Sequence, residues 1–251
     1  MTDRKYTLLN AAAIDSWNAA GWEWGVPTEH DAFLRAKDGD WQVLLTPTKF
    51  VPRDWFPKLA GSRVLGLASG GGQQMPIFTA AGAHCTVMDL SQSQLQSERL
   101  VADREGYDIE IVRGDMTEPF PFADESFDWI FHPVSNCYIR DVQHVWNECY
   151  RVLKPGRVLL AGLDNGVSFA FEDDTGKLKY RLPFDPLSDE RLYRDCIEND
   201  WGIQFSHSVE EQVGGQLKAG LRLTDIFQDT DGAGPLHAFN VPTFFATRAV
   251  K

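Results

Sequence analysis

The chain has 251 residues, of which 43% are apolar, and it carries a formal net charge of −12 at pH 7. This apolar content excludes extensive disorder, and the length suits one large domain or one domain with a cap. The negative charge repels phosphate backbones and anionic lipid surfaces, so we expect neither nucleic acid nor a membrane as a partner.

The four cysteines and the start of the chain indicate a cytoplasmic protein. Cysteines 85, 137, 149 and 196 show no CxxC or Cys/His metal spacing, so we expect buried, reduced thiols and no metal site. The first residues lead into no apolar segment typical of a signal peptide. No stretch approaches the roughly 20 apolar residues that a membrane-spanning helix needs. The oligomeric state stays open.

Residues 1–60 form a tryptophan-rich segment that we interpret as an arm or cap. It holds five of the eight tryptophans, and prolines at 27, 47, 52 and 57 interrupt it. We expect an irregular path with one or two short helices, the clearest at 29–37. Because aromatic side chains at this density must be buried, the arm packs onto the main domain, lines a substrate pocket, or does both.

From residue 61 onward, apolar runs alternate with helical patterns. Such alternation is typical of a parallel sheet with helices on both faces. The turn at 154–156 is expected to precede the fifth strand. Strands are predicted at 63–68, 85–89, 109–113, 127–132 and 157–163, and helices at 73–81, 92–105 and 141–152.

The region 164–207 breaks this alternation, and we expect a lid-like insert there, since a connection of this length is usually functional. The sequence predicts a strand at 177–182 and a helix at 188–199 within it. Between 164 and 210 there are 11 acidic and five basic residues, which favours a neutral or cationic acceptor. A helix at 208–220 and strands at 221–227 and 242–250 are expected to follow.

Three consecutive glycines at 70–72 follow the first apolar run and precede a helical pattern. Without side chains, such a loop lets a ligand approach backbone N–H groups at a helix N-terminus. Asp89 ends the next apolar run, 17 residues after Gly72, close to the spacing of a carboxylate that binds a ribose. Together these features predict a nucleoside cofactor. Met75 stands where a dinucleotide fingerprint has its third glycine, so NAD fits poorly; a nicotinamide-dependent oxidoreductase remains an alternative.

The order of these motifs resembles the class I S-adenosylmethionine-dependent methyltransferases of the small-molecule type. The resemblance is strongest over 61–163, where segments 124–128 and 151–157 match the family's turns before its fourth and fifth strands. Segments 67–74 and 132–136 are similar to a bacterial subgroup of that family. The resemblance implies an α/β, Rossmann-like, doubly wound fold with a mostly parallel seven-stranded sheet and an antiparallel C-terminal strand. The methyltransferase domain would span 61–251, after the arm 1–60.

The resemblance also implies the residues that hold S-adenosylmethionine. Asp89 matches the acid that binds both ribose hydroxyls, and two such hydrogen bonds to a charged oxygen group are worth about 1.5–3 kcal/mol each. Leu90 and Met116 match the apolar contacts on the two adenine faces, and Asp115 matches the acceptor for the adenine amino group. The expected cofactor-binding residues are Ala68, Ser69, Gly70, Gly71, Gly72, Gln73, Asp89, Leu90, Gly114, Asp115, Met116, His132 and Pro133.

Gly66 departs from the family pattern, which usually has an acid there to hold the cofactor's amino group. Gln73 or Gln74 is expected to take over that role. Plain structural interpretations stay open for the motifs themselves. Asp89 could cap the next helix, Asp115 could form a local turn, and the glycines could make a simple tight turn.

The loop after the fourth strand is where the methyl acceptor is expected, because ligands bind outside the carboxyl ends of parallel strands. His132 is the candidate general base, since its unperturbed pKa lies near 6.5. A purely structural role at the strand end is the alternative. Ser135, Asn136 and Tyr138 are the candidate substrate-binding residues, and His207 is a weaker candidate base.

These features predict S-adenosylmethionine-dependent methyl transfer to a small-molecule acceptor by in-line displacement, with S-adenosylhomocysteine as product. The alternative is a non-catalytic S-adenosylmethionine-binding sensor or partner protein, which the departure at Gly66 supports.

Overall fold

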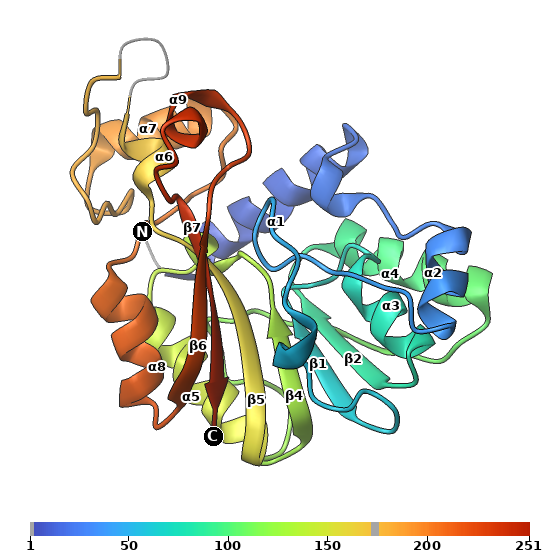
Figure 1. Cartoon of the computed structure of the whole chain (residues 1–251). Helices are drawn as coiled ribbons and strands as arrows, with labels where there is room; N and C mark the ends of the chain where they lie inside the picture. Colours follow the sequence, from blue (N-terminus) through green and yellow to red (C-terminus); the bar gives the residue numbers. More distant parts are fainter. Residues whose placement is uncertain (1–2, 172–175) are drawn as a thin grey trace.

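A seven-stranded sheet forms the centre of the protein in the computed structural model, which describes residues 3–171 and 176–251 (Figure 1). The strand order is β3-β2-β1-β4-β5-β7-β6. β1 to β5 are parallel, and β7 runs antiparallel to both β5 and β6. This confirms the expected fold class. The strands are β1 Arg63–Leu67, β2 His84–Asp89, β3 Glu110–Arg113, β4 Phe127–His132, β5 Leu153–Asp164, β6 Arg222–Asp229 and β7 Phe244–Val250.

Helices cover both faces of the sheet. α3 and α4 pack against β2, and α5 and α8 pack against β5 and β6 on the opposite face. The helices are α1 Asp3–Ala19, α2 His30–Lys37, α3 Gln74–Ala80, α4 Gln92–Glu105, α5 Val142–Val152, α6 Val167–Ala170, α7 Glu190–Glu198, α8 Gly215–Lys218 and α9 Gly234–Ala238. A π-helical turn, Glu210–Gly214, leads into α8 where the sequence predicts one helix.

Alternating side chains of the strands supply two separate cores. Trp129 and Phe131 of β4 face α3, where Phe78 lies edge-on to Trp129 at a centroid distance of 4.7 Å. Ile130, between them, faces the other side and shares a core with Trp146 of α5. Successive side chains of a strand point to opposite faces of the sheet. Because both faces are buried here, both sets of side chains are apolar, and the strands appear in the sequence as continuous apolar runs.

Local capping signals explain why the helices begin and end as the sequence predicts. The Ser91 hydroxyl accepts a hydrogen bond from the Gln94 N–H at 3.1 Å at the start of α4, and Gly106 ends it with φ +69°. Asp141 caps α5 in the same way by accepting from the Gln143 N–H at 3.1 Å. Such caps depend only on neighbouring residues, so they can be read from the sequence.

Two predictions about the arm and the insert are wrong. α1 is a 17-residue helix where the sequence suggested only short ones. No strand exists in 177–182; the one pairing in that segment is an isolated bridge between Phe171 and Leu178. Tyr180 and Phe184 are instead buried against α1 and α7. Long-range packing therefore overrides local propensity in both segments.

The expected turn at 154–156 is also wrong, because β5 begins at Leu153 and continues through it. Leu153 pairs with Phe127, and the register shifts before Trp129 pairs with Val158. Gly156 takes φ +72° in this irregular stretch. A bulge tolerates a proline without a backbone N–H, so Pro155 does not interrupt the strand.

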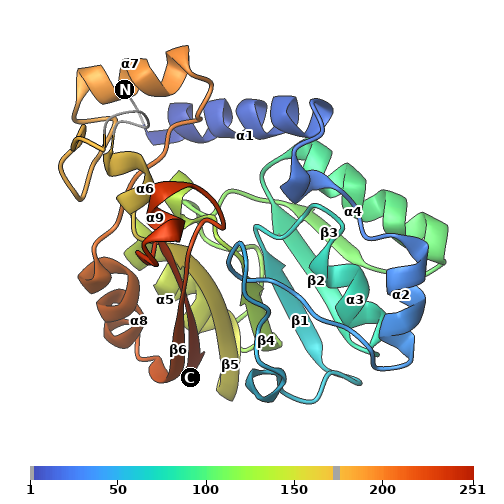
Figure 2. The ribbon, with the colours of Figure 1, turned by 45° about the horizontal axis from the view of Figure 1, so that its top comes forward.

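The cap consists of α1 and the described part of the insert, 165–171 and 176–207, and it lies above the carboxyl ends of the parallel strands (Figure 2). It has its own apolar cluster, in which Tyr6 and Phe205 meet at a centroid distance of 5.1 Å. The Asn10 amide donates to the Ile203 carbonyl at 3.0 Å, which ties α1 to the insert. The other end of α1 contacts α4, because Asp15 accepts from the Ser93 N–H at 3.0 Å.

All four cysteines are free and buried, as expected. Within residues 3–171 and 176–251, none of the helices has the length and apolar character needed to cross a bilayer.

Candidate functional site

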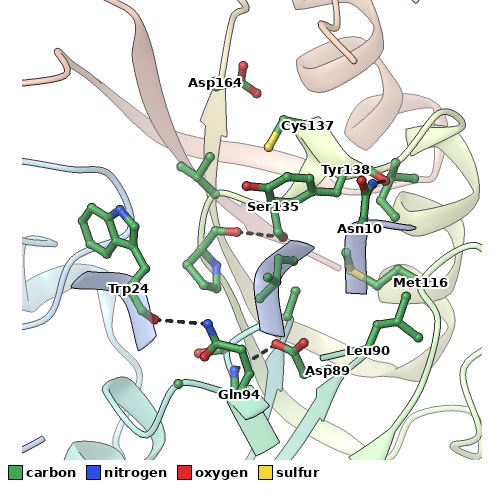
Figure 3. Close-up of a pocket in the computed structure, with 18 of the residues that line it drawn as sticks. Asn10, Trp24, Asp89, Leu90, Gln94, Met116, Ser135, Cys137, Tyr138 and Asp164 are labelled. Carbon is green, nitrogen blue, oxygen red and sulfur yellow. Dashed lines mark hydrogen bonds between the residues drawn. The ribbon is translucent and has the colours of Figure 1, made fainter. Parts of the chain in front are cut away.

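A cavity of about 350 Å³ lies where the strand ends meet the cap (Figure 3). Its wall is formed by the glycine loop after β1, the ends of β2, β4 and β5, and the arm 1–60, including α1. Ligands in open α/β sheets bind outside the carboxyl ends of the strands, which is where this cavity opens.

The surroundings of the glycine loop leave no space for side chains at these positions. A Cβ atom on Gly70 would lie 3.0 Å from Asp89 Oδ2, and one on Gly71 would lie 2.6 Å from the Trp24 carbonyl oxygen. Gly72 has φ +69°, a conformation that L side chains rarely adopt. The loop therefore needs glycine at each of these positions, and it leaves backbone open to the cavity at Gly70 and Gly71.

Asp89 is fixed at the end of β2 by two backbone N–H groups. Its Oδ2 accepts from the Gly70 N–H at 3.1 Å, and its Oδ1 accepts from the Ser91 N–H at 2.9 Å. Burial raises the pKa of Asp89 to about 6, against the opposing effect of these hydrogen bonds. The carboxylate is thus mainly ionised at neutral pH and is held rigidly against the glycine loop.

The expected adenine contacts lie next to Asp89. Leu90, Gly114, Asp115 and Met116 all line the cavity. Asp115 Oδ1 accepts from the N–H and the hydroxyl of Thr117, at 2.9 and 2.7 Å. Asp115 therefore forms a local turn and also borders the cavity, so the two interpretations of this residue are compatible.

Packing explains the departure at Gly66. A Cβ atom there would lie 2.6 Å from Sδ of the buried Met75, so an acidic side chain would have to displace the methionine side chain. Gln74 lines the cavity and accepts from the Ser69 hydroxyl at 2.9 Å. Gln73 also borders the cavity, but its amide nitrogen donates to the carbonyl groups of residues 23 and 26, at 2.8 and 3.1 Å. Of the two glutamines, Gln74 is better placed to take over the missing acid's role.

His132 does not reach the cavity, which contradicts its expected role as general base. The side chain is fully buried, with Nδ1 3.0 Å from the Leu67 carbonyl and Nε2 2.9 Å from Asn136 Oδ1. Burial lowers its pKa, against the effect of both hydrogen bonds, so the imidazole is neutral at pH 7. The imidazole therefore has no direct contact with the cavity; its Nδ1 lies 3.4 Å from the hydroxyl of Ser135, which does line the cavity.

Three further expectations are also not met by the geometry. Asn136 is buried behind the wall and donates to Gln212 Oε1 at 2.9 Å. Gly72 lies at the back of the loop, where a Cβ would meet the Ser97 carbonyl oxygen at 2.8 Å. His207 is buried with Nε2 2.8 Å from the Ile139 carbonyl. These side chains and backbone groups support the wall without bordering the cavity.

The remaining expected residues are brought together at the cavity. Those that line it are Ala68, Ser69, Gly70, Gly71, Gln73, Asp89, Leu90, Gly114, Asp115, Met116, Pro133, Ser135 and Tyr138.

The arm 1–60 lines the cavity, which is one of the two roles that the sequence predicts for it. Two parts of the wall were not predicted as individual residues. One is the inner face of α1, since no short-range signal shows which side of a helix will face a cavity. The other is Asp164, which ends β5 much as Asp89 ends β2, and this shared position was an available signal. The missed lining residues include Thr7, Asn10, Ala11, Ile14, Cys137, Asp164, Phe169, Gln204 and Phe244. Across the described ranges, no group of three or more His, Cys, Asp or Glu side chains is arranged to hold a metal ion.

The model of a family described as "Methyltransferase domain" matches residues 65–161. The uncharacterized methyltransferase YbaJ of Bacillus subtilis (strain 168) is 41% identical over 249 residues, covering 96% of this chain and 97% of that protein. The chain belongs to the class I S-adenosylmethionine-dependent methyltransferases. This membership leaves the nicotinamide-dependent alternative without support and makes the chain an enzyme.

Other relatives of this methyltransferase agree on the fold. Sterol 24-C-methyltransferase ERG6B of Gibberella zeae is 32% identical over 181 residues, which cover 70% of this chain and 44% of that protein. The crystal structure of an S-adenosylmethionine-dependent methyltransferase from Mesorhizobium loti superposes with a TM-score of 0.62 at 18% identity, covering 79% of this chain and 95% of the other.

Proposed function

We propose that this methyltransferase transfers the methyl group of S-adenosylmethionine to a small molecule held between the strand ends and the cap. The observation that carries the proposal is the cavity itself, about 350 Å³ in volume, with Asp89 at one end and Ser135 and Tyr138 farther along it (Figure 3). Small-molecule sites usually have a volume of about 300–1,000 Å³.

The chain offers a complete set of contacts for the adenosyl part of the cofactor. Asp89 would accept hydrogen bonds from the ribose hydroxyls, and Leu90 and Met116 would contact the adenine faces. Asp115 would accept from the adenine amino group. These four residues follow β2 and β3, whose adjacent ends bring them to one side of the cavity.

The methionine end of the cofactor would be held by neutral groups. Ser69 and Gln74 lie side by side through their 2.9 Å hydrogen bond and border the cavity next to the glycine loop. The backbone of Gly71, which also lines the cavity, adds to this surface. Hydroxyl, amide and peptide groups can bind both an amino group and a carboxylate, which suits the two charges of an amino-acid tail.

S-adenosylmethionine supplies an activated methyl group on a positively charged sulfur. The protein mainly has to align the acceptor and to exclude water, and alignment of this kind can contribute up to about 7–11 kcal/mol to lowering the barrier. The cap closes the cavity from above, and Trp24 covers one side, where the Gln94 amide donates to its carbonyl at 3.4 Å. These elements would keep solvent from the reacting atoms.

The enclosed shape favours a small acceptor over a polymer. α1 and the insert cover the strand ends, and the net charge of −12 repels nucleic acid. The name of the Gibberella zeae relative specifies a sterol acceptor for that protein. For this chain it supports a small acceptor without specifying which one.

The test is calorimetric titration with S-adenosylhomocysteine, S-adenosylmethionine and NAD, combined with a screen for S-adenosylhomocysteine release from acceptor mixtures. We expect micromolar binding of both adenosyl compounds, none of NAD, and turnover with at least one small acceptor. Binding without turnover on any acceptor would favour the sensor alternative. Absence of adenosyl binding would reject the proposal altogether.

A further inference from the structure

Asp164 is a buried carboxylate with an unsatisfied oxygen at the cavity. The side chain is only 5% exposed, and it lines the cavity from the end of β5. Its Oδ2 accepts from the Gly166 N–H at 3.1 Å, whereas Oδ1 is buried and has no hydrogen-bond partner among residues 3–171 and 176–251. A buried carboxylate oxygen without a donor is unfavourable, so the position suits a ligand that brings a donor.

Asp164 lies at the opposite end of the cavity from the proposed cofactor site. In Figure 3, Asp89 and Leu90 are at one end, and Asp164 lies next to Cys137 at the other. The Tyr138 hydroxyl points into the cavity and hydrogen-bonds to no residue in the described ranges. Asp164 therefore belongs to the acceptor side of the site.

The charges around the cavity have a single sign. Among the residues of the described chain that line it, the carboxylic acids are Asp89, Asp115 and Asp164, and none is lysine, arginine or histidine. An anionic acceptor would therefore be buried among carboxylates without a cationic partner. A cationic acceptor would be attracted by the same carboxylates.

The walls near Asp164 add an aromatic surface. Tyr138, Phe169 and Phe244 line the cavity together with Asp164. Aromatic faces attract ammonium groups, and the attraction is stronger where water is excluded. A carboxylate among aromatic rings is a suitable environment for a substituted ammonium ion.

We propose that the methyl acceptor is a cationic amine whose N–H group binds the unpartnered Oδ1 of Asp164. This inference rests on the proposed methyl transfer and adds the substrate class. Burial raises the pKa of Asp164 to about 6, against the effect of the Gly166 N–H, so the group is mainly ionised at pH 7 and remains basic enough to accept a proton.

The contact with Asp164 Oδ1 also converts the ammonium group of the acceptor into a nucleophilic amine. One proton moves from the ammonium nitrogen to Asp164 Oδ1, which leaves a neutral amine with a free lone pair and a neutral carboxylic acid. The total charge of the pair does not change. The methyl donor is the S-adenosylmethionine of the proposed function, and the proton on Asp164 later returns to solvent.

The test measures binding to protein saturated with S-adenosylhomocysteine, by calorimetry with benzylamine, putrescine, benzyl alcohol and benzoate. We expect at least one amine to bind tenfold or more tighter than the alcohol and the benzoate. Asp164→Asn should weaken the amine at least tenfold and leave S-adenosylhomocysteine affinity within twofold, since asparagine can still accept from the Gly166 N–H. Asp103→Asn, an exposed change on α4, is the matched control and should alter neither affinity.

The pH dependence separates a direct contact from a structural role. Amine affinity should fall as the pH drops from 7 to 5, because Asp164 gains a proton in that range, and the fall should be absent in Asp164→Asn. Cys137 and Tyr138, the titratable neighbours that interact with Asp164 in the described residues, stay neutral there, because burial raises the pKa of both.

Three results would overturn the inference. They are equal affinity for amine and alcohol, unchanged amine affinity in Asp164→Asn, and no amine binding to protein that binds S-adenosylhomocysteine. Loss of S-adenosylhomocysteine binding by the unmodified protein would instead contradict the proposed function.

Discussion

The two sides of the cavity are built differently. The side proposed to hold the cofactor comes from the three loops that follow β1, β2 and β3, and it rests on parallel strands that pair along their length. The cap side brings together α1 and the insert, with Asn10 and Ile203 hydrogen-bonded across 193 positions of sequence. The cap also has its own apolar cluster. Such a separation lets the acceptor side change while the sheet keeps the cofactor side in place.

Asp89 and Asp164, one from each side of the cavity, differ in how many of their carboxylate oxygens accept hydrogen bonds from the protein. Each ends a strand, and burial raises the pKa of each to about 6. Asp89 has backbone N–H donors on both oxygens, whereas Asp164 has one on a single oxygen. The first carboxylate is held by backbone donors on both oxygens, and the second has one oxygen without a partner in the part of the chain that the structure describes.

The largest expected effect is on the cap. Phe205→Ala should lower the free energy of unfolding of the cap by about 3–5 kcal/mol, because the Phe205 side chain is 2% exposed and packs on Tyr6. Hydrogen exchange should then accelerate in α1 and α7 and stay unchanged in β1 and β2. Phe239→Ala, at a side chain that is 84% exposed, is the control and should change neither. Equal acceleration in the sheet would show that the cap is not a separate cooperative unit.

The next effect concerns the cavity wall. His132→Ala should lower the free energy of unfolding by about 1–3 kcal/mol. The neutral imidazole has one N–H, which it donates to the Leu67 carbonyl or to Asn136 Oδ1, and the substitution leaves that buried acceptor without its donor. The contribution should also depend on pH. Burial lowers the pKa of His132 in the folded state, so the unfolded chain binds the proton first, and the stabilisation is complete above about pH 6.5 and declines at lower pH.

Denaturant titrations at several pH values would check this prediction, with the exposed His84→Ala as control. A variant that kept wild-type stability but lost methyl transfer at unchanged cofactor affinity would restore the imidazole to a role in the reaction.

A smaller effect is expected for the cofactor side. Asp89→Asn should weaken S-adenosylhomocysteine binding about tenfold, or about 1.4 kcal/mol, because the ribose loses a charged acceptor. In the unmodified protein the affinity should fall as the pH drops below about 6, where Asp89 becomes protonated. Calorimetry between pH 5 and 7 measures both effects, and the variant should show a flatter pH profile. Unchanged affinity would remove Asp89 from the site.

The smallest effect is expected where the cap meets the rest of the protein at the surface. Arg140 pairs with Asp185 at 2.7 Å, with the two side chains 44% and 32% exposed. An ion pair this exposed contributes about 0.2–1 kcal/mol, so Arg140→Ala should lower stability by no more than that in low salt. Arg194→Ala, at an exposed position within α7, is the control. A decrease in stability larger than this, measured by thermal unfolding, would show that the pair of Arg140 and Asp185 holds the cap in place.

The sequence by itself determined the parts of the protein that depend on neighbouring residues. The glycine loop, the capping of α4 by Ser91 and the strand-end position of Asp89 follow from backbone conformation and hydrophobic period. Both are properties of short segments. The family resemblance added roles for residues in those same segments, and the sheet topology followed with it.

Only the tertiary structure decided which side chains share a surface. The sequence could not show that His132 is enclosed behind the wall or which side of α1 borders the cavity. Nor could it show that one oxygen of Asp164 has no partner within the described ranges. Each of these depends on contacts between segments far apart in the chain, and such contacts leave no periodic pattern in either segment. Burial and the choice of hydrogen-bond partner are therefore fixed by packing. This explains why most of the residues predicted to bind the cofactor do line one cavity, whereas His132 and Asn136, predicted for the reaction and the acceptor, do not.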